Sequence, residues 1–299
     1  MAQLARQRPV PPPFSRSLWR FVMRLATYAV LIAVGLLMAF PFIFMFFSSL
    51  KTSAEVITVP PRLLPDPWWN PAQWQWGNYR ELLSIPSLPF GRQLLNSIVV
   101  TIGIVSGQVL TSLLAGYAFA RLRFPGRDTM FVVYLGTLMV PFAVLIVPMY
   151  QLMLLFNWDD KLVALILPWV FSAYGTFLMR QFFLTMPREL EEAALIDGAN
   201  RWQILFRIAV PLAVPAIATL ATFSFLYAWN SFLWPLIIIT DAKSRVITQG
   251  IMDLQALYAA RTELVMAGSV LAVLPTMIVY LLAQRYFIEG VATAGLAGR

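Results

Sequence analysis

The segment EAALIDGANRWQILFRIAVP, residues 192–211, stands between two long apolar runs and is more polar than either. Three carboxylates lead into it: Glu189, Glu191 and Glu192. Acidic side chains are favourable beside the positive end of a helix dipole, and glycine accepts the left-handed conformation in which many helices end. The acids therefore predict a helix that starts near residue 189, and Gly198 predicts where it ends.

The residues around this short helix predict an elbow of two helices over 185–207. Thr185 is expected to cap the first helix, with Pro187 in its first turn, and Asn200 to cap a second helix that continues into the next apolar run. Small side chains at Ala193 and Ala194 let another surface come close. An acidic helix of this kind is usually a solvated linker, so the pattern alone leaves two interpretations, a plain connection or a docking element.

The composition places the elbow in an integral membrane protein. Of the 299 residues, 60% are hydrophobic and 12% are charged, with a mean hydropathy of +0.73, whereas about a quarter of the residues of a soluble domain are charged. The chain contains neither cysteine nor histidine. This excludes disulfides and thiolate metal sites, and it removes the side chain that most readily transfers protons near neutral pH.

Six apolar runs reach the roughly 20 residues that a helix needs to cross a bilayer. We therefore predict an all-α membrane protein with six transmembrane helices. A basic tail (1–24) precedes a first helix (25–49), which is too long for a cleaved signal peptide and is expected to be a signal anchor. An extracytoplasmic loop (50–93), a five-helix core (94–285) and a short cytoplasmic tail (286–299) complete the plan. The six runs cover 25–49, 94–120, 129–150, 162–179, 208–238 and 264–284.

The distribution of Lys and Arg predicts which side of the membrane each loop faces. Fourteen of the 22 basic residues fall on the side that holds both termini and the elbow, and eight fall on the other. The acids divide six to eight, so the first side carries the whole net charge of +8. Because loops rich in Lys and Arg stay in the cytoplasm, both termini and the elbow are expected to be cytoplasmic. The basic charge is thus a topology signal, and no nucleic-acid partner is expected.

Three features leave alternatives open. As one helix the fifth run would reach ~46 Å, beyond the ~30 Å hydrocarbon core, so it either breaks at Asn230 or Pro235 into a re-entrant segment or tilts. Tryptophans of the first outer loop either stack on sugar rings or, more simply, form an interfacial belt. Polar side chains in the spans either bind a neutral polyol or, more often, bond neighbouring helices. These side chains are Thr101, Ser106, Gln108, Thr111, Ser112, Ser172, Tyr174, Thr176 and Ser224.

The elbow sequence resembles the EAA signature of the inner-membrane permease subunits of binding-protein-dependent ABC importers. The family pattern is Glu-Ala-Ala, three residues, Gly, nine residues, and Ile-x-Leu-Pro. Val210 stands where the pattern has Leu, and this conservative change is the only departure. The matching residues are Glu192, Ala193, Ala194, Gly198, Ile208 and Pro211.

Residues outside the signature are similar to the sugar-importer branch of this family. The likeness extends over 90–298 and is closest to the six-span permease subunit of maltose transporters. The residues that carry it are Asn96-Ser97 at the start of the second span, Tyr117-Ala118-Phe119-Ala120-Arg121 at its end, Trp229-Asn230, and the tail Arg285-Tyr286-Phe287 with Gly290, Gly295 and Gly298.

The resemblance implies the type I permease fold of ABC importers, in the inner membrane of a bacterial or archaeal cell. The chain would form half of the translocation pathway for a carbohydrate. The elbow would be the coupling helix, seated on a separate ATP-hydrolysing subunit. Glu192 would pair with a basic group of that subunit, Ala193 and Ala194 would give close approach, Gly198 the turn, and Ile208 with Pro211 the anchor into the fifth span.

The same resemblance implies a set of partners. These are a second permease subunit, two ABC ATPase subunits at the elbow, and an extracytoplasmic solute-binding protein that contacts the outer loop 239–263, all around a chain embedded in the lipid bilayer. The chain itself has no G-x-x-x-x-G-K-[ST] phosphate-binding loop. We therefore expect a transport subunit that is not an enzyme, that binds no cofactor or metal, and whose partner ATPase uses the ATP.

Two other functions remain open at this point. One is an importer permease for another polar solute, such as glycerol phosphate. The other is an ion-coupled secondary transporter, which usually needs charged residues inside its spans. None of the six apolar runs contains Asp, Glu, Lys or Arg in its interior, so the importer is favoured.

Overall fold

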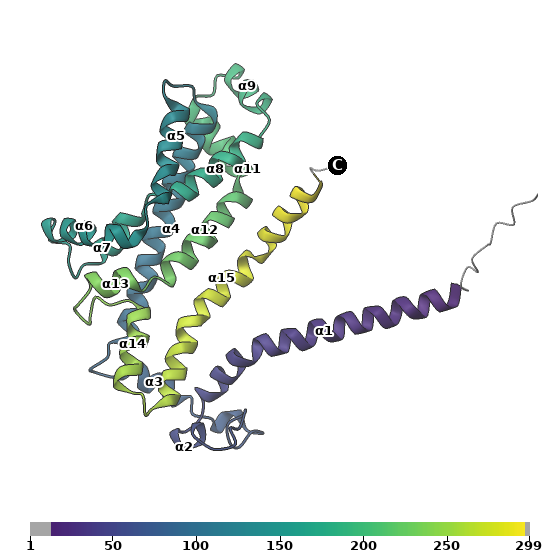
Figure 1. Ribbon diagram of the computed structural model, residues 1–299, viewed down its shortest axis with the longest axis vertical. Coiled ribbons are helices and arrows are strands. Elements are labelled where there is room, and N and C mark those ends of the chain that lie inside the picture. Colours follow the sequence, from purple (N-terminus) through teal and green to yellow (C-terminus); the bar gives the residue numbers. More distant parts are fainter. Residues whose placement is uncertain (1–12, 297–299) are drawn as a thin grey trace, which may run out of the picture.

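The computed structural model describes the backbone of residues 13–296 and the side chains of residues 18–284. Over these residues the chain is helical and contains no strand, as predicted (Figure 1). The predicted tail before residue 13, Gly298 and the side chains of Arg285, Tyr286 and Phe287 lie outside the described parts.

The elements follow one another in this order: α1 (Pro13–Ser48), α2 (Ser53–Val56), η1 (Pro71–Gln73), α3 (Gly77–Ser84), α4 (Phe90–Arg121), α5 (Arg127–Gly136), η2 (Thr137–Met139), α6 (Phe142–Leu155), α7 (Leu162–Ile166), η3 (Leu167–Trp169), α8 (Ala173–Thr185), α9 (Glu189–Ile196), α10 (Arg201–Ile204), the π-helical η4 (Leu205–Ala209), α11 (Val210–Leu212), α12 (Val214–Trp229), α13 (Leu233–Ile238), α14 (Ile247–Leu257) and α15 (Thr262–Leu296).

Three helices, α1, α4 and α15, are each long and apolar enough to cross a membrane. Helix α1 starts inside the region that the sequence assigns to the tail and runs away from the bundle, meeting α15 only near its C-terminal end (Figure 1). None of the side chains in its most apolar stretch is buried. Helix α1 therefore presents an apolar surface along most of its length.

Helix α4 is the centre of the bundle. It packs against both α8 and α12, which also contact each other (Figure 1). A Cβ atom on Gly116 would lie 2.7 Å from Cβ of Met179, closer than real contacts allow, so the small residue permits the close approach of α4 and α8. Near the end of α4 its side chains join an apolar core with α8, α10 and α12, formed by Leu113, Tyr117, Met179, Phe183, Ile204, Leu205 and Leu220.

The third and fourth predicted spans are bent helix pairs, whereas the sequence predicts one continuous run for each. The segment α5–η2 meets α6 at 97°, and α7–η3 meets α8 at 40°. The first bend falls at Val140 and Pro141, where Val140 is extended with ψ 113°. Proline disfavours the helical conformation in the residue before it, which explains the break at this position.

The fifth predicted span breaks twice. Helix α12 ends at Trp229 and α13 begins at Leu233, so the break falls at Asn230, one of the two predicted positions, and the alternative of a single tilted helix is wrong. A second break, which the sequence did not indicate, lies at Ala213, where the segment from Arg201 to Leu212 meets α12 at 78°. With each bent pair counted as one span, the described residues contain up to six spans.

The end of α4 opposite the elbow is tied to the segment between α13 and α14. The side-chain amide of Asn96 donates to the carbonyls of Lys243 and Arg245, at 2.9 Å each. The backbone N–H of Ile247 donates to the hydroxyl of Ser97 at 2.7 Å. These bonds fix the start of α4 against the start of α14.

Candidate functional site

The first helix of the predicted elbow, α9, begins at Glu189 as expected but without the predicted cap. The Thr185 hydroxyl instead donates to the carbonyl of Phe182 at 2.7 Å, inside α8. Helix α8 continues through Thr185, and Pro187 lies before α9 rather than in its first turn. The prediction of a Thr185 cap is therefore wrong, because the hydroxyl bonds back to the helix that precedes it.

The turn and the second helix of the elbow are as predicted. Gly198 has φ +83°, the left-handed conformation that glycine accepts at a helix end. The Asn200 side chain accepts a bond from the Gln203 N–H at 2.9 Å, and the Gln203 side chain accepts one from the Asn200 N–H at 2.8 Å. This reciprocal capping box starts α10.

The Glu-Ala-Ala triplet has two outward residues and one inward residue. Glu192 and Ala193 are exposed, whereas Ala194 is buried in the core beneath the elbow. Of the two alanines expected to give close approach, only Ala193 therefore faces outward. The most exposed apolar side chain of α9 is Ile196, at 87%, and no pattern in the sequence marks it as a contact residue.

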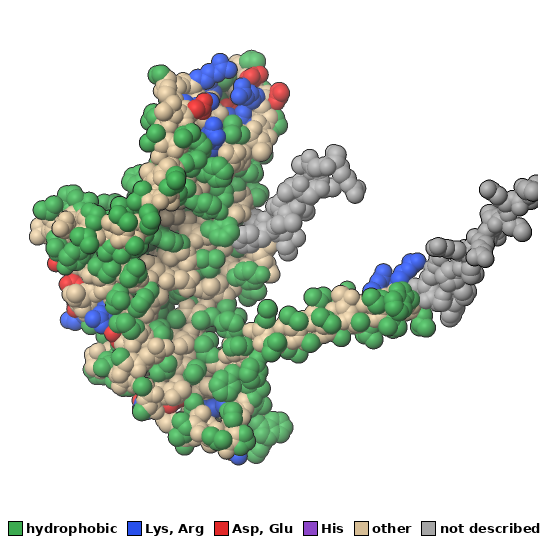
Figure 2. Space-filling view, viewed as in Figure 1, with side chains coloured by type: hydrophobic (Ala, Val, Ile, Leu, Met, Phe, Trp, Pro, Cys, Tyr) green, Lys and Arg blue, Asp and Glu red, His purple; other side chains and the backbone are tan. Residues whose placement is uncertain are grey.

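The anchor residues at the far side of the elbow differ in burial. Ile208 is half-buried and packs against the same core, while Pro211 is exposed in α11, just before the 78° bend. Figure 2 shows charged side chains gathered at this end of the molecule, beyond a broad band of hydrophobic surface.

A buried carboxylate holds the elbow to the end of α4. Glu191 Oε1 lies 3.2 Å from Arg121 Nε, and Glu191 Oε2 lies 3.8 Å from the guanidinium of Arg201. The hydroxyl of Tyr117 donates to Glu191 at 3.5 Å, and the Arg121 guanidinium also donates to the carbonyl of Met186. Two arginines on different helices thus neutralise one buried acid.

The sequence offered a partial signal for this cluster. From the sequence, Glu191 was interpreted together with Glu189 and Glu192 as an acid that suits the start of a helix. Tyr117 and Arg121 were noted only as part of the resemblance to the sugar-importer branch. Tyr117 and Arg121 are four residues apart and share one face of a helix. A Tyr and an Arg on one face at the end of a span, with an acidic helix later in the chain, could have indicated that Arg121 has a buried acidic partner.

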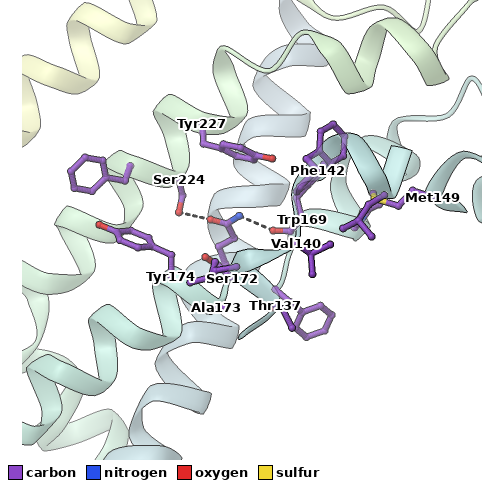
Figure 3. Close-up of a pocket in the computed structure, with 16 residues that line it drawn as sticks. Thr137, Val140, Phe142, Met149, Trp169, Ser172, Ala173, Tyr174, Ser224 and Tyr227 are labelled. Carbon is purple, nitrogen blue, oxygen red and sulfur yellow. Dashed lines mark hydrogen bonds between the residues drawn. The ribbon is translucent and has the colours of Figure 1, made fainter. Parts of the chain in front are cut away.

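A cavity of about 510 Å³ lies between the middle of α4, the two bends at α5–α6 and α7–α8, and α12. Gln108 connects two walls of this cavity: its amide nitrogen donates to the Trp169 carbonyl at 2.8 Å, and its amide oxygen accepts from the Ser224 hydroxyl at 2.6 Å. Figure 3 marks these two bonds with dashed lines beside the labelled Trp169 and Ser224. Aromatic rings of Trp169, Tyr174 and Tyr227 line the same space. None of the lining residues is charged.

Five of the nine polar side chains singled out in the spans form hydrogen bonds within or between helical segments. Ser106 donates to the carbonyl of Ile102 in its own helix at 2.7 Å, Thr111 donates to the carbonyl of Val170 at 2.7 Å, and Ser172 caps α8 by accepting from the Gly175 N–H at 3.0 Å. Gln108 and Ser224 bond each other, and both line the cavity together with Ser172 and Tyr174. Among the described residues, no group of three or more carboxylates is arranged to hold a metal ion.

Comparison with known proteins shows that this chain is similar to the permease subunits of binding-protein-dependent importers. Residues 108–293 match the family model described as binding-protein-dependent transport system inner membrane component. The chain is 37% identical over 268 residues to the sn-glycerol-3-phosphate transport system permease protein UgpE of Pectobacterium atrosepticum, which covers 87% of this chain and 93% of that protein. It is 35% identical over 278 residues to the protein of the same name from Agrobacterium fabrum, covering 91% and 96%.

Solved structures share the fold. A chain of a bacterial ABC transporter involved in the import of the acidic polysaccharide alginate superposes with a TM-score of 0.76, covering 94% of this chain and 100% of that chain at 24% identity. A second chain comes from a bacterial alginate ABC transporter in complex with an alginate pentasaccharide-bound periplasmic protein. It gives a TM-score of 0.59 at 17% identity, covering 89% and 95%.

Proposed function

This chain belongs to the family of binding-protein-dependent transport system inner membrane components, and from that premise we propose that it forms half of the solute pathway of an ATP-driven carbohydrate importer. It is a permease subunit and not an enzyme, as the EAA resemblance indicated. Separate ATPase subunits supply the energy, and the elbow receives it.

The observation that carries this proposal is the construction of the elbow. Glu191 holds it from inside between Arg121 and Arg201, while Glu192 and Ile196 point away from the bundle. A force applied from outside reaches the spans only through a stiff, packed element. Glu192 would pair with a basic group on the ATPase, and Ile196 would enter an apolar recess beside it.

We infer the membrane topology from the same arrangement and from the distribution of charge. The three continuous helices and the three bent pairs would be six membrane spans, with both termini and the elbow in the cytoplasm of a bacterial cell. The excess of Lys and Arg on the elbow side supports this orientation. A second permease subunit would complete the pathway and cover α1, and the periplasmic binding protein would contact the outer loop 239–263.

The cavity around Gln108 would be this subunit's share of the pathway. Its aromatic faces and its amide and hydroxyl groups suit the hydroxyl-rich, uncharged part of a solute. A sugar fits this chemistry, and so does the glycerol moiety of sn-glycerol-3-phosphate, the solute in the names of the relatives. A phosphate group would have to meet its positive charges on another subunit, because the residues that line the cavity carry none.

Uptake by the reconstituted complex tests this function. Vesicles would contain this chain, a second permease subunit and the ATPases, with loaded binding protein outside. We expect uptake only when both ATP and the binding protein are present, and competition between a neutral disaccharide and sn-glycerol-3-phosphate would identify the solute class. Uptake by this chain in vesicles that lack the ATPase, driven by an ion gradient, would establish a secondary transporter instead.

A further inference from the structure

Helix α4 differs from the other helices that surround the cavity because it has no bend. The pairs α5–α6, α7–α8 and the segment before α12 are broken at 97°, 40° and 78°. Helix α4 runs unbroken for 32 residues, a length of ~48 Å that exceeds the ~30 Å hydrocarbon core. It is therefore long enough to connect the two faces of the membrane without a hinge.

The elbow end of α4 is fixed by a charge pair that water hardly reaches. The Arg121 side chain is 5% exposed and that of Glu191 is 10% exposed, at a separation of 3.2 Å. The two groups approach as an ion pair without the alignment of a hydrogen bond, and Arg121 is further held by the Met186 carbonyl. Removing either partner leaves an uncompensated charge in a buried place. The elbow is thus tied to α4 as well as to its sequence neighbours.

The opposite end of α4 is fixed by neutral hydrogen bonds. Asn96 bonds two carbonyls at 2.9 Å, and Ser97 receives the Ile247 N–H at 2.7 Å, which holds the start of α14. Both side chains are buried. The segment held here belongs to the outer loop 239–263, which the proposed function assigns to the binding protein.

We propose that α4 is the strut that transmits coupling between the elbow and the outer loop, with Glu191, Arg121 and Asn96 as positioning residues at its two ends. This inference rests on the proposed function. The covalent routes from the elbow pass through α8 and α12, and each meets a bend within its span, where a displacement is absorbed as rotation. Helix α4 carries the displacement directly, because both of its ends are clamped and no bend lies between them.

The test is stimulation of ATP hydrolysis by loaded binding protein in the full reconstituted complex. Glu191→Gln breaks the ion pair with Arg121 at the elbow end of α4, which we call the inner clamp. Asn96→Ala breaks the hydrogen bonds at the opposite end, the outer clamp, and Asn96 lies ~38 Å from Arg121 along the helix. We expect each to lower the stimulation about fivefold or more and to raise the ATP used per solute imported, while the complex still co-purifies. The matched controls are Glu189→Gln, an exposed acid of the same helix, and Ser106→Ala, a hydroxyl of α4 that bonds its own helix.

If the Arg121–Glu191 ion pair only stabilises the elbow, the two variants should behave differently from each other. If Glu191→Gln loses stimulation but Asn96→Ala keeps it, α4 is not the strut, and normal stimulation in both variants equally overturns the proposal. If the Glu191→Gln complex does not assemble, the test uses Asn96→Ala and the smaller change Ser97→Ala at the outer clamp, and normal stimulation in both of these variants overturns the proposal. The double variant Arg121→Gln/Glu191→Gln leaves no buried charge unpaired and is expected to assemble, but it lacks the same ion pair, so its stimulation should stay as low as that of Glu191→Gln. Recovery of stimulation in the double variant would show that the unpaired charge, and not the tie to α4, caused the loss. A wild-type complex that the binding protein fails to stimulate would instead contradict the proposed function.

Discussion

The elbow and the Gln108 cavity are both attached to α4, yet their chemistry is opposite. At the end of the helix, Arg121, Glu191 and Arg201 form a charged cluster, whereas the middle of the helix contributes one neutral amide to a cavity with uncharged walls. A charge is costly at membrane depth and affordable where the helix reaches the aqueous surface. The difference teaches that ionic contacts are concentrated at the elbow, where we propose that force enters, while neutral polar and aromatic groups line the space that we propose for the solute.

Reversing the outward charge of the elbow should have the largest effect. Glu192→Lys opposes the basic group expected on the ATPase, so ATP-coupled uptake is expected to fall about 100-fold. Glu189→Lys changes another exposed acid of α9 and serves as the control, with uptake close to wild type. Uptake and stimulated ATP hydrolysis in reconstituted vesicles measure both. Unchanged coupling in Glu192→Lys would contradict the role of the elbow.

A change in the cavity should separate solute passage from coupling. Gln108→Leu removes the bonds to Trp169 and Ser224, which hold α4, η3 and α12 around the space. We expect uptake to fall about tenfold, because two buried polar groups lose their partner, while stimulation of ATP hydrolysis by the binding protein persists. Ser106→Ala is the neutral control. If stimulation of ATP hydrolysis were lost together with uptake, the cavity and the elbow would not have separate roles.

The turn of the elbow offers a conformational test. Gly198 has φ +83° with open space around it, so Gly198→Ala is strained only by its backbone and should cost about 1–2 kcal/mol. A lower Tm and a few-fold loss of uptake are expected. Gly126→Ala, at φ +76°, carries the same strain outside the elbow and should lower Tm without a specific loss of coupling. Gly136→Ala, at φ −57° in open space, should change neither.

The smallest effect is expected in the turn between α6 and α7. The Asp241 N–H and Thr240 donate to the carboxylate of Asp160, which holds the pKa of Asp160 below its usual value. A depressed folded-state pKa gives stability that is present at neutral pH and lost as the pH falls through that pKa. Asp160 has φ 56°, a conformation that Asn tolerates as Asp does, so Asp160→Asn removes the charge without added backbone strain. It should therefore lower Tm by about 2–4 °C at pH 7, and the difference should shrink toward about pH 3. A difference that grows with acid would contradict this assignment.

The sequence predicted most of the elbow because its signals are local. The turn at Gly198 depends only on the φ angle of that residue, and the cap at Asn200 depends only on a partner three residues along the chain. Both were therefore predicted correctly. Thr185 failed for a related reason: a hydroxyl at the end of a helix has two local choices, and the sequence does not rank them. The excess length of the fifth run indicated either a break at Asn230 or Pro235 or a tilted helix, and the structure has the break at Asn230.

The remaining features depend on contacts between segments far apart in the chain. Glu191 meets Arg121 across 70 positions, and Gln108 meets Ser224 across 116. Hydrophobic pattern and motif spacing place each residue on its helix but do not indicate which faces meet. The inward position of Ala194 and the cavity at the two bends required the packed arrangement of α4, α8 and α12.

Site-specific cross-linking from the tip of the elbow tests the central claim most directly. The chain has no cysteine, so Ile196→Cys introduces its sole thiol at a position that is 87% exposed. In the assembled, transport-competent complex we expect this thiol to cross-link to an ATPase subunit and the cross-link to stop uptake, whereas Val132→Cys, on an exposed apolar face of α5, gives no such product. Absence of the Ile196 cross-link in a complex that transports solute would show that force enters this subunit elsewhere.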